Sequence, residues 1–203
     1  MPNPRSPARS WDVLLLGGAS GTGKTSVSYR LARYFEVALT EVDDFQVILE
    51  CMTTPEQQPA LHYWNTHPEA AELPAERIVE LQIAVGQAML PALAAVIANH
   101  LESRTPIVLE GDFILPALLA HPSIAEHAAA GAVRAIFVTE PDEAQIVENY
   151  LRREPQYGPQ HGRARVSWLY NQWLEQEARR YGGTVVPARP WDTVLERIVA
   201  MRR

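Results

Sequence analysis

The feature that most constrains this chain is the octapeptide at residues 18–25, which fits the pattern G-x-x-x-x-G-K-[ST] of a phosphate-binding P-loop. The loop and the serine after it are Gly18, Ala19, Ser20, Gly21, Thr22, Gly23, Lys24, Thr25 and Ser26. Lysine and arginine together number 18, and Lys24 is the only lysine among them. A lysine ammonium is a compact charge on a flexible stem, whereas a guanidinium is planar with fixed donor directions. We therefore expect Lys24 to reach between the outer two phosphates of a nucleotide.

The residues around this loop predict the elements that a P-loop needs. Residues 13–16 form a short apolar run that is typical of a buried parallel strand. After the loop, Val27, Leu31 and either Tyr34 or Phe35 recur at helical spacing. Glycine amides and the positive end of that helix would bind phosphate oxygens, and the Thr25 hydroxyl would bind Mg²⁺. The order of the elements argues against a glycine-rich turn with an incidental lysine.

The bulk composition indicates an ordinary globular protein. The chain has 203 residues, 47% hydrophobic and 21% charged, so we expect one domain over residues 11–203 after a disordered tail at residues 1–10. A formal net charge of −6 disfavours a nucleic-acid partner, although a local basic patch stays open. No apolar run approaches the roughly 20 residues of a membrane span, and no secretory signal is evident. We expect no membrane partner and a cytoplasmic location.

One cysteine, Cys51, excludes an intramolecular disulfide and a cysteine metal cluster. We expect its side chain to be half-buried and to have no catalytic role.

Strands and helices alternate along the chain, which predicts an α/β fold with a parallel sheet covered on both faces. The expected strands are Trp11–Leu16, Val37–Val42, Pro106–Leu109, Val133–Val138 and Thr184–Val186. The first expected helix follows the P-loop and ends at about Phe35. The others cover Phe45–Cys51, Pro74–Leu101, Pro141–Arg153, Ser167–Tyr181 and Thr193–Met201. We expect a kink at Pro91, a Thr139 cap before Pro141–Arg153, and a capping box formed by Thr193 and Glu196. Residues 154–165 are expected to form a mobile loop.

Acidic residues follow the second and third expected strands. In parallel sheets, ligands bind at the carboxyl ends of the strands, so Asp43, Asp44, Glu110 and Asp112 would lie beside the P-loop. We expect Asp43 to act as a general base or a Mg²⁺ ligand and Glu110 to support metal or water. Asp44, Phe45, Glu110 and Asp112 are candidates for binding an acceptor. The aspartates could instead cap helices, with even odds for Asp44.

Four arginines flank a glycine- and proline-containing stretch near residue 158. Arg152, Arg153, Arg163 and Arg165 could form a lid over residues 152–166 that closes on transferring phosphates. A solvated surface turn is the alternative.

The segment 45–75 holds the candidates for recognising an acceptor. His62, Tyr63, Trp64, His67 and the nearby Arg77 could bind a sugar, an aromatic compound or an acid. The aromatic residues Tyr63 and Trp64 could equally belong to the core.

Together these motifs resemble the P-loop small-molecule kinases of adenylate-kinase-like fold. The matching residues are 17–25, Asp43-Asp44-Phe45, Leu109-Glu110-Gly111 and the arginine segment. The glycine-rich opening with Glu110, Gly111 and Pro116 is similar to the 2-phosphoglycerate kinase branch, and Asp43-Asp44-Phe45 to nucleoside-type kinases, where the first aspartate is the base. The resemblance implies a three-layer sandwich, a five-stranded parallel sheet of order 2-3-1-4-5, ATP and Mg²⁺ as cofactors, and an adenine contact near Arg189.

The expected function is an ATP- and Mg²⁺-dependent kinase that phosphorylates a hydroxyl or phosphate of a small-molecule acceptor. A P-loop ATPase that drives a conformational change and a non-catalytic nucleotide-binding regulator are the alternatives. No Asn-Lys-x-Asp guanine motif occurs, because Lys24 is the single lysine. Whether the chain forms a homodimer is open.

Overall fold

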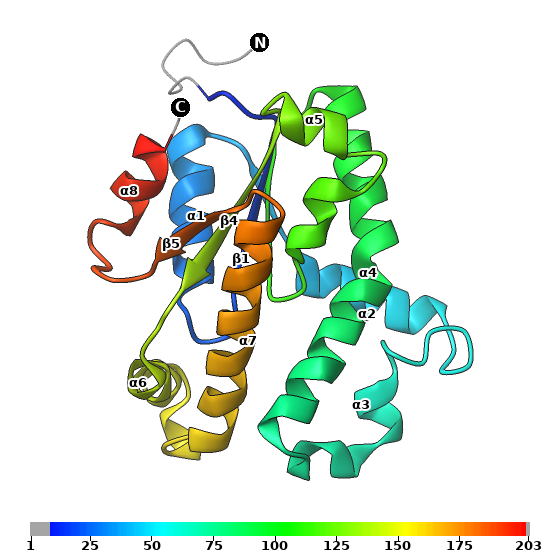
Figure 1. Cartoon of the computed structure of the whole chain (residues 1–203), viewed down its shortest axis with the longest axis vertical. Coiled ribbons are helices and arrows are strands. Elements are labelled where there is room, and N and C mark those ends of the chain that lie inside the picture. Colours follow the sequence, from blue (N-terminus) through cyan, green and yellow to red (C-terminus); the bar gives the residue numbers. More distant parts are fainter. Residues whose placement is uncertain (1–8, 202–203) are drawn as a thin grey trace.

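Five parallel strands form the centre of the molecule in the computed structural model, which describes residues 9–201 (Figure 1). The strands are β1 (Val13–Gly17), β2 (Ala38–Glu41), β3 (Ile107–Gly111), β4 (Val133–Thr139) and β5 (Thr184–Pro187). Their order is β2-β3-β1-β4-β5, which confirms the predicted sheet. Residues 1–8 of the expected tail lie outside the described residues.

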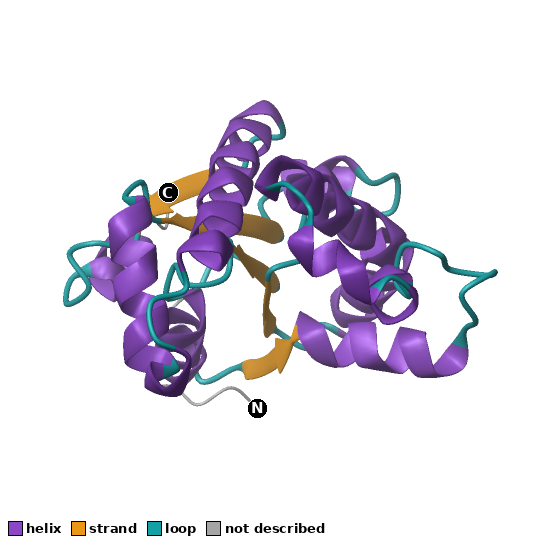
Figure 2. Cartoon of the chain, turned by 90° about the horizontal axis from the view of Figure 1, so that it is seen from below, coloured by secondary structure: helices purple, strands orange, loops and turns teal. Residues whose placement is uncertain are grey.

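Helices cover both faces of this sheet, as Figure 2 shows from below. The helices are α1 (Lys24–Phe35), α2 (Val42–Met52), α3 (Tyr63–Thr66), α4 (Ala75–Ser103), α5 (Ala125–Ala129), α6 (Glu143–Arg153), α7 (His161–Arg180) and α8 (Val194–Ala200). Three short 3₁₀ helices cover Pro68–Glu72, Pro116–Ala120 and Pro155–Tyr157.

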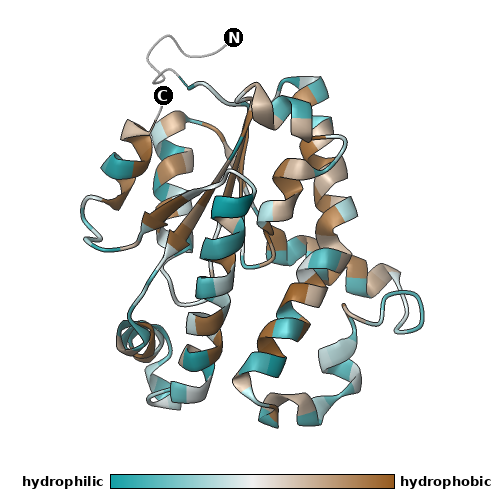
Figure 3. Ribbon diagram, viewed as in Figure 1, coloured by the Kyte–Doolittle hydropathy of each residue, from teal (hydrophilic) through white to brown (hydrophobic). Residues whose placement is uncertain are grey.

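The two-residue period of a strand divides the core into two layers. In β1, Leu14 and Leu16 pack with the buried residues of α1 and α8. Val13 and Leu15 point the opposite way, into a cluster with α4 and α7. All five residues of β1 are buried, so its sequence is apolar throughout (Figure 3). This burial fixes the P-loop at the end of the best-packed strand.

Several predicted boundaries were wrong: the start of the second helix, the end of the third strand and the capping residue of α6. Helix α2 begins at Val42, directly after β2, so Asp43 lies in its first turn. Strand β3 runs through Glu110 and Gly111. The side chain of Asp142, rather than Thr139, caps α6 by accepting from the Ala144 amide at 3.0 Å.

Other differences lie in the second half of the chain and in residues 53–74. Helix α7 begins at His161, so residues 161–165 are helical and the 154–165 stretch is not one loop. Thr193 does not form the predicted capping box, because its hydroxyl donates to the Pro190 carbonyl. Residues 53–74, for which no helix was predicted, contain α3 and a 3₁₀ helix. Helix α4 includes Pro91, as the predicted helix does.

The described residues contain one helix, α4, that is long and apolar enough to cross a membrane by length and composition. This corrects the expectation that no segment approaches such a span. The core helix of a soluble protein passes the same test, and Val85, Met89, Leu93 and Ile97 of α4 are buried in the core. Cys51 at the end of α2 is exposed rather than half-buried.

Gly86 marks the closest approach of α4 to the chain after β3. An added Cβ would lie 2.8 Å from Cγ and Cδ2 of Leu115, which is 2% exposed. Gly86→Ala should therefore lower stability by about 1–3 kcal/mol through overpacking, although alanine is the better helix former. Gly162→Ala, on α7 with nothing within 4 Å of its Cβ, should cost nothing. Thermal unfolding checks both, and equal melting temperatures for Gly86→Ala and wild type would contradict the packing argument.

Candidate functional site

The P-loop between β1 and α1 has the backbone that phosphate binding requires. Gly21 and Gly23 have φ of 80° and 85°, a region that side chains rarely adopt. A Cβ on Gly18 would lie 2.5 Å from the Val138 carbonyl oxygen, and one on Gly23 would lie 2.4 Å from the Trp191 ring. The buried Thr22 hydroxyl donates to the Ala19 carbonyl at 2.9 Å. The loop is therefore held in one shape by glycine, close packing and an internal hydrogen bond.

Lys24 lies at the start of α1 with its side chain almost fully buried. Its ammonium forms ion pairs with Asp112 and, at 3.6 Å, with Glu110. Burial acts to lower the pKa of Lys24, but the charges of Asp112 and Glu110 outweigh it and raise the pKa. Lys24 therefore stays protonated and occupies the position between the loop and the carboxylates.

The tips of β1, β2 and β3 bring three carboxylates around this one lysine. Glu110 is 2% exposed and accepts a hydrogen bond from the Thr25 hydroxyl at 3.2 Å. Burial raises the pKa of Glu110, with Lys24 opposing the shift. Desolvation and the charge of Asp112 raise the pKa of Asp43. Desolvation is the largest cause of both shifts. The charge count is a separate argument: three carboxylates lie near one lysine, so a further cation would be favourable here.

The chemistry of this donor set fits Mg²⁺. A hydroxyl and carboxylate oxygens are hard ligands, and they come from Thr25, Asp43 and Glu110. Within residues 9–201, no group of three or more His, Cys, Asp or Glu side chains forms a complete metal cage. Mg²⁺ usually keeps several waters and binds one or two carboxylates together with substrate phosphates, so a complete cage is not required.

A cavity of about 630 Å³ opens beside the P-loop. Its lining includes Gly21, Gly23, Lys24, Thr25, Ser26, Arg30, Asn149, Arg152, Arg153 and Trp191. The volume lies in the usual range for small-ligand sites. The predicted Ser26, Arg152 and Arg153 are thus placed with the P-loop. Another cavity, of about 490 Å³, lies at the other end of the sheet and includes no P-loop residue.

Sequence reasoning missed three residues of the nucleotide-sized cavity. The Asn149 amide on α6 donates to the Gly21 carbonyl at 2.8 Å and so braces the P-loop. Trp191 packs against Gly23, and Arg30 of α1 donates to the Trp191 carbonyl at 3.4 Å. The position of Trp191, two residues after Arg189, was the one available signal. Nothing in the pattern of α6 distinguished Asn149 from a surface polar residue.

Arg189 does not line this cavity. Its guanidinium binds both carboxylate oxygens of Glu140 at 2.8 and 2.9 Å, and Glu140 is fully buried. A bidentate pair of this kind is geometrically specific, and here it fixes the loop after β5 to the end of β4. The adenine contact expected for Arg189 stays a prediction.

Arg163 and Arg165, predicted to join the lid, lie elsewhere on α7. Arg163 pairs with Glu154 at 2.8 Å and lies 4.3 Å from the Tyr150 ring centre. Arg165 pairs with Glu143 at 3.1 Å. Both line a separate cavity of about 390 Å³ together with Trp64. The predicted arginine lid is therefore divided between two cavities.

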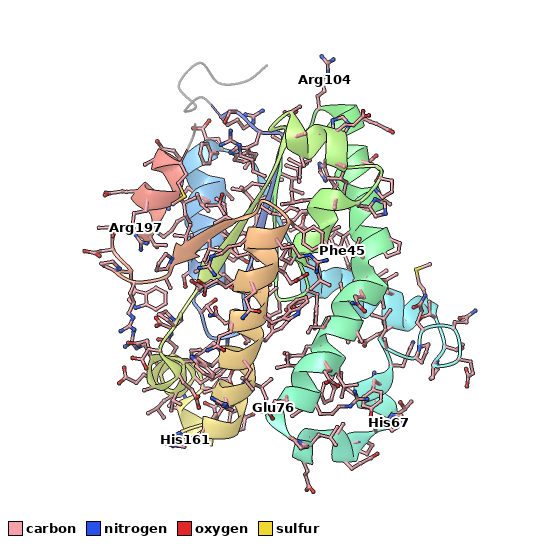
Figure 4. The ribbon with its side chains drawn as sticks, viewed as in Figure 1. Phe45, His67, Glu76, Arg104, His161 and Arg197 are labelled. Atoms are coloured by element: carbon pink, nitrogen blue, oxygen red, sulfur yellow. The ribbon has the colours of Figure 1, made fainter. Side chains whose placement is uncertain are left out.

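The remaining acceptor candidates are dispersed. His62 is buried, with its Nε2 3.1 Å from the Thr53 hydroxyl. Arg77 is exposed on α4 and pairs with Glu80. Asp44 is exposed, and Phe45 packs partly against the core (Figure 4). His67 stacks on Tyr63 with ring centres 4.2 Å apart.

The structure therefore brings Lys24, Thr25, Asp43, Glu110 and Asp112 into one electrostatic cluster. Of the candidates in the acceptor segment, Trp64 lines the cavity that also contains Arg163 and Arg165.

Comparisons with known proteins identify the fold. No protein-family model matches the chain, and no curated protein matches it. A sugar kinase from a Janibacter species aligns over 96% of this chain and 94% of its own, at 19% identity and a TM-score of 0.56. A gluconokinase from Sinorhizobium meliloti aligns over 95% and 92%, at 18% identity and a TM-score of 0.54. A shikimate kinase from Acinetobacter baumannii, in complex with shikimate, covers 95% of both chains at 15% identity and a TM-score of 0.50. The chain has the P-loop kinase fold of these proteins.

Replacing Glu110 by glutamine should stabilise the protein without ligand and weaken its binding of Mg-ATP. The raised pKa of Glu110 shows that its ionised form is disfavoured in the folded state, so removing the charge should raise stability at neutral pH by about 0.5–2 kcal/mol. Glutamine keeps an oxygen for the Thr25 hydroxyl. Thermal unfolding with and without Mg-ATP checks this, and a less stable variant would show that Glu110 is held mainly by its bond to Lys24.

Proposed function

We propose that this protein is an ATP- and Mg²⁺-dependent kinase that transfers a phosphoryl group to a hydroxyl or phosphate of a small-molecule acceptor. The observation that carries the proposal is the cluster of Lys24 with Asp43, Glu110 and Asp112 beside a P-loop cavity of nucleotide size. The likeness in fold to proteins named sugar kinase, gluconokinase and shikimate kinase supports it.

The P-loop would bind the phosphates of ATP through its amides and through Lys24. To do so, the Lys24 ammonium exchanges Asp112 for phosphate oxygens, which its flexible stem permits. Arg152 and Arg153, at the edge of the same cavity, would neutralise charge that develops during transfer. Thr25 and Glu110 would hold Mg²⁺, which when bound supplies positive charge to the phosphate oxygens.

The transfer needs a group to accept the proton of the acceptor hydroxyl. The acceptor oxygen bonds to the γ-phosphorus, the bond from that phosphorus to the β–γ bridging oxygen breaks, and ADP leaves. The hydroxyl proton passes to a carboxylate. Asp43 suits this role because its pKa is raised, and a stronger base is more effective near neutral pH.

Assays of ADP formation from ATP, with each of a panel of metabolites added, test the proposal. The panel includes gluconate, shikimate, 2-phosphoglycerate and nucleosides, since the finer resemblance to 2-phosphoglycerate and nucleoside kinases is part of the proposal. ADP formation that rises steeply with one added metabolite supports a kinase. Hydrolysis that no metabolite increases but a protein partner stimulates would indicate an ATPase instead.

Asp43→Asn should bind ATP nearly normally and lose kcat by about 10²–10⁴, the usual contribution of a general base. In wild type, kcat/KM should fall as pH drops through the pKa of Asp43, because the base must be ionised. The raised pKa places this fall at a higher pH than for an ordinary aspartate, and Asp43→Asn should abolish it. Asp44→Asn, on the same helical turn, should lower kcat far less. A wild-type kcat for Asp43→Asn would remove the base assignment.

The single lysine permits a direct test of phosphate binding. An amine-selective reagent can modify only Lys24 and the N-terminal amine, which peptide mass mapping separates. Mg-ATP should protect Lys24 and adenosine should not, because adenosine lacks phosphates. Lys24→Arg should be inactive, since the planar guanidinium has different donor directions. A fully active Lys24→Arg variant, or protection of Lys24 by adenosine as strong as that by Mg-ATP, would contradict the P-loop assignment.

A further inference from the structure

The second arginine pair lines a cavity of its own. Arg163 and Arg165 face a space of about 390 Å³ between the start of α7 and the start of α4, which His161 and Glu76 mark in Figure 4. This space borders the nucleotide cavity through Tyr150. The Tyr150 ring contacts the Arg163 guanidinium, and its Cζ would lie 3.2 Å from a Cβ on Gly21. A ligand here would therefore lie next to the P-loop without occupying the nucleotide cavity.

The charges of this cavity are complementary to an anion. Arg163 and Arg165 each pair with one glutamate, Glu154 and Glu143, and neither glutamate lines the cavity. Among the described residues the lining includes no acidic side chain. The hydrogen bonds of both arginines to protein groups start from Nη1. Nε and Nη2 are left as donors, in the fork that suits a carboxylate or a phosphate.

The remaining walls are mostly apolar. Leu73, Ile78 and Val166 line the cavity with the indole of Trp64. Gln82 is the other polar side chain of the lining, and its Oε1 is buried without a hydrogen-bond partner in residues 9–201. A buried unpaired acceptor is costly, and one hydroxyl of a ligand would satisfy it. A polyhydroxylated sugar acid would leave most of its hydroxyls unpaired against these walls.

We infer that this cavity is the acceptor site, and that the acceptor carries an anionic group, an apolar body and a hydroxyl. The inference rests on the proposed kinase function. The geometry agrees with it, because Tyr170 lies seven residues after Arg163 on α7, about 10 Å along the helix. The Tyr170 hydroxyl donates to the Asp112 carbonyl at 2.8 Å. An anion on Arg163 would place a hydroxyl at the other end of a compact molecule near the carboxylates.

Binding of simple probes tests this site. The probe is para-hydroxyethylbenzoate, with three comparison compounds: its neutral amide, para-ethylbenzoate, and gluconate. Isothermal titration in the presence of the non-hydrolysable ATP analogue AMP-PNP measures each dissociation constant. We expect millimolar binding of the probe. The neutral amide should bind at least about tenfold more weakly, because it lacks the hydrogen bonds between charged groups. Gluconate should also bind at least about tenfold more weakly, because most of its hydroxyls would be unpaired against the apolar walls.

Variants locate the binding. Arg163→Met and Arg165→Met should each weaken the probe by about tenfold or more. Arg180→Met is the matched control, since Arg180 lies on the same helix, pairs with Glu177 and does not line the cavity; it should bind the probe normally. Gln82→Leu should leave anion binding intact but make the hydroxylated probe and para-ethylbenzoate equal, an effect that unfolding would not produce.

The outcomes separate this inference from the proposed function. Absence of millimolar probe binding, tighter binding of gluconate than of the probe, or binding unaffected by both arginine variants would overturn the acceptor site. Nucleotide binding that requires Lys24 would still support the proposed function in each case. Conversely, the protein could bind the probe through Arg163 and Arg165 but fail to bind ATP. That result would support an anion site in this cavity and contradict the proposed kinase function.

Discussion

The buried ion cluster around Lys24 is the interaction on which the site depends. Lys24 forms ion pairs with Glu110 and Asp112 at the end of β3, and the charge of Asp43, which is exposed on α2, also acts on it. Loss of the Lys24 charge would leave both of its paired carboxylates uncompensated, which is strongly destabilising, whereas loss of Glu110 would leave Lys24 paired with Asp112. The same cluster nevertheless carries excess negative charge, because Asp43, Glu110 and Asp112 lie near a single lysine. Folding therefore assembles a site that a divalent cation and phosphates would complete.

The sheet explains why these groups meet. Leu16 pairs with Glu110 in the β1–β3 register, and Glu41 pairs with Glu110 in the β2–β3 register. The three strand ends therefore lie at the same level, and the P-loop, α2 and the chain after β3 start from adjacent points. Glu110 is held inside β3 and cannot move away from Thr25. Asp43 lies two residues past β2, in the first turn of α2, and Asp112 lies directly after β3.

The fold and the centre of the site could be predicted because their signals are local. Apolar runs mark strands that are buried on both faces, and the P-loop pattern specifies a backbone shape through its glycines. What could not be predicted depends on contacts between distant segments. Asn149 bonds to Gly21 across 128 positions, and Arg189 bonds to Glu140 across 49. Arg163 and Arg165 were grouped with Arg152 and Arg153 by sequence distance alone. The two pairs line different cavities, although Arg153 and Arg163 both form ion pairs with Glu154.

That separation has a consequence for how the two cavities communicate. Tyr150 is fully buried, and its hydroxyl lies 2.7 Å from the Ser167 hydroxyl, which fixes α6 to α7. On the same helix, the Asn149 amide donates to the Gly21 carbonyl of the P-loop, and the ring of Tyr150 contacts the Arg163 guanidinium. A shift of α6 toward bound phosphates would therefore also move the Tyr150 ring that contacts Arg163. Because packed side chains of this kind transmit displacement rather than absorb it, occupancy of the nucleotide cavity would alter the position of the arginines in the other. The shared helix α6 is the physical connection between the two cavities.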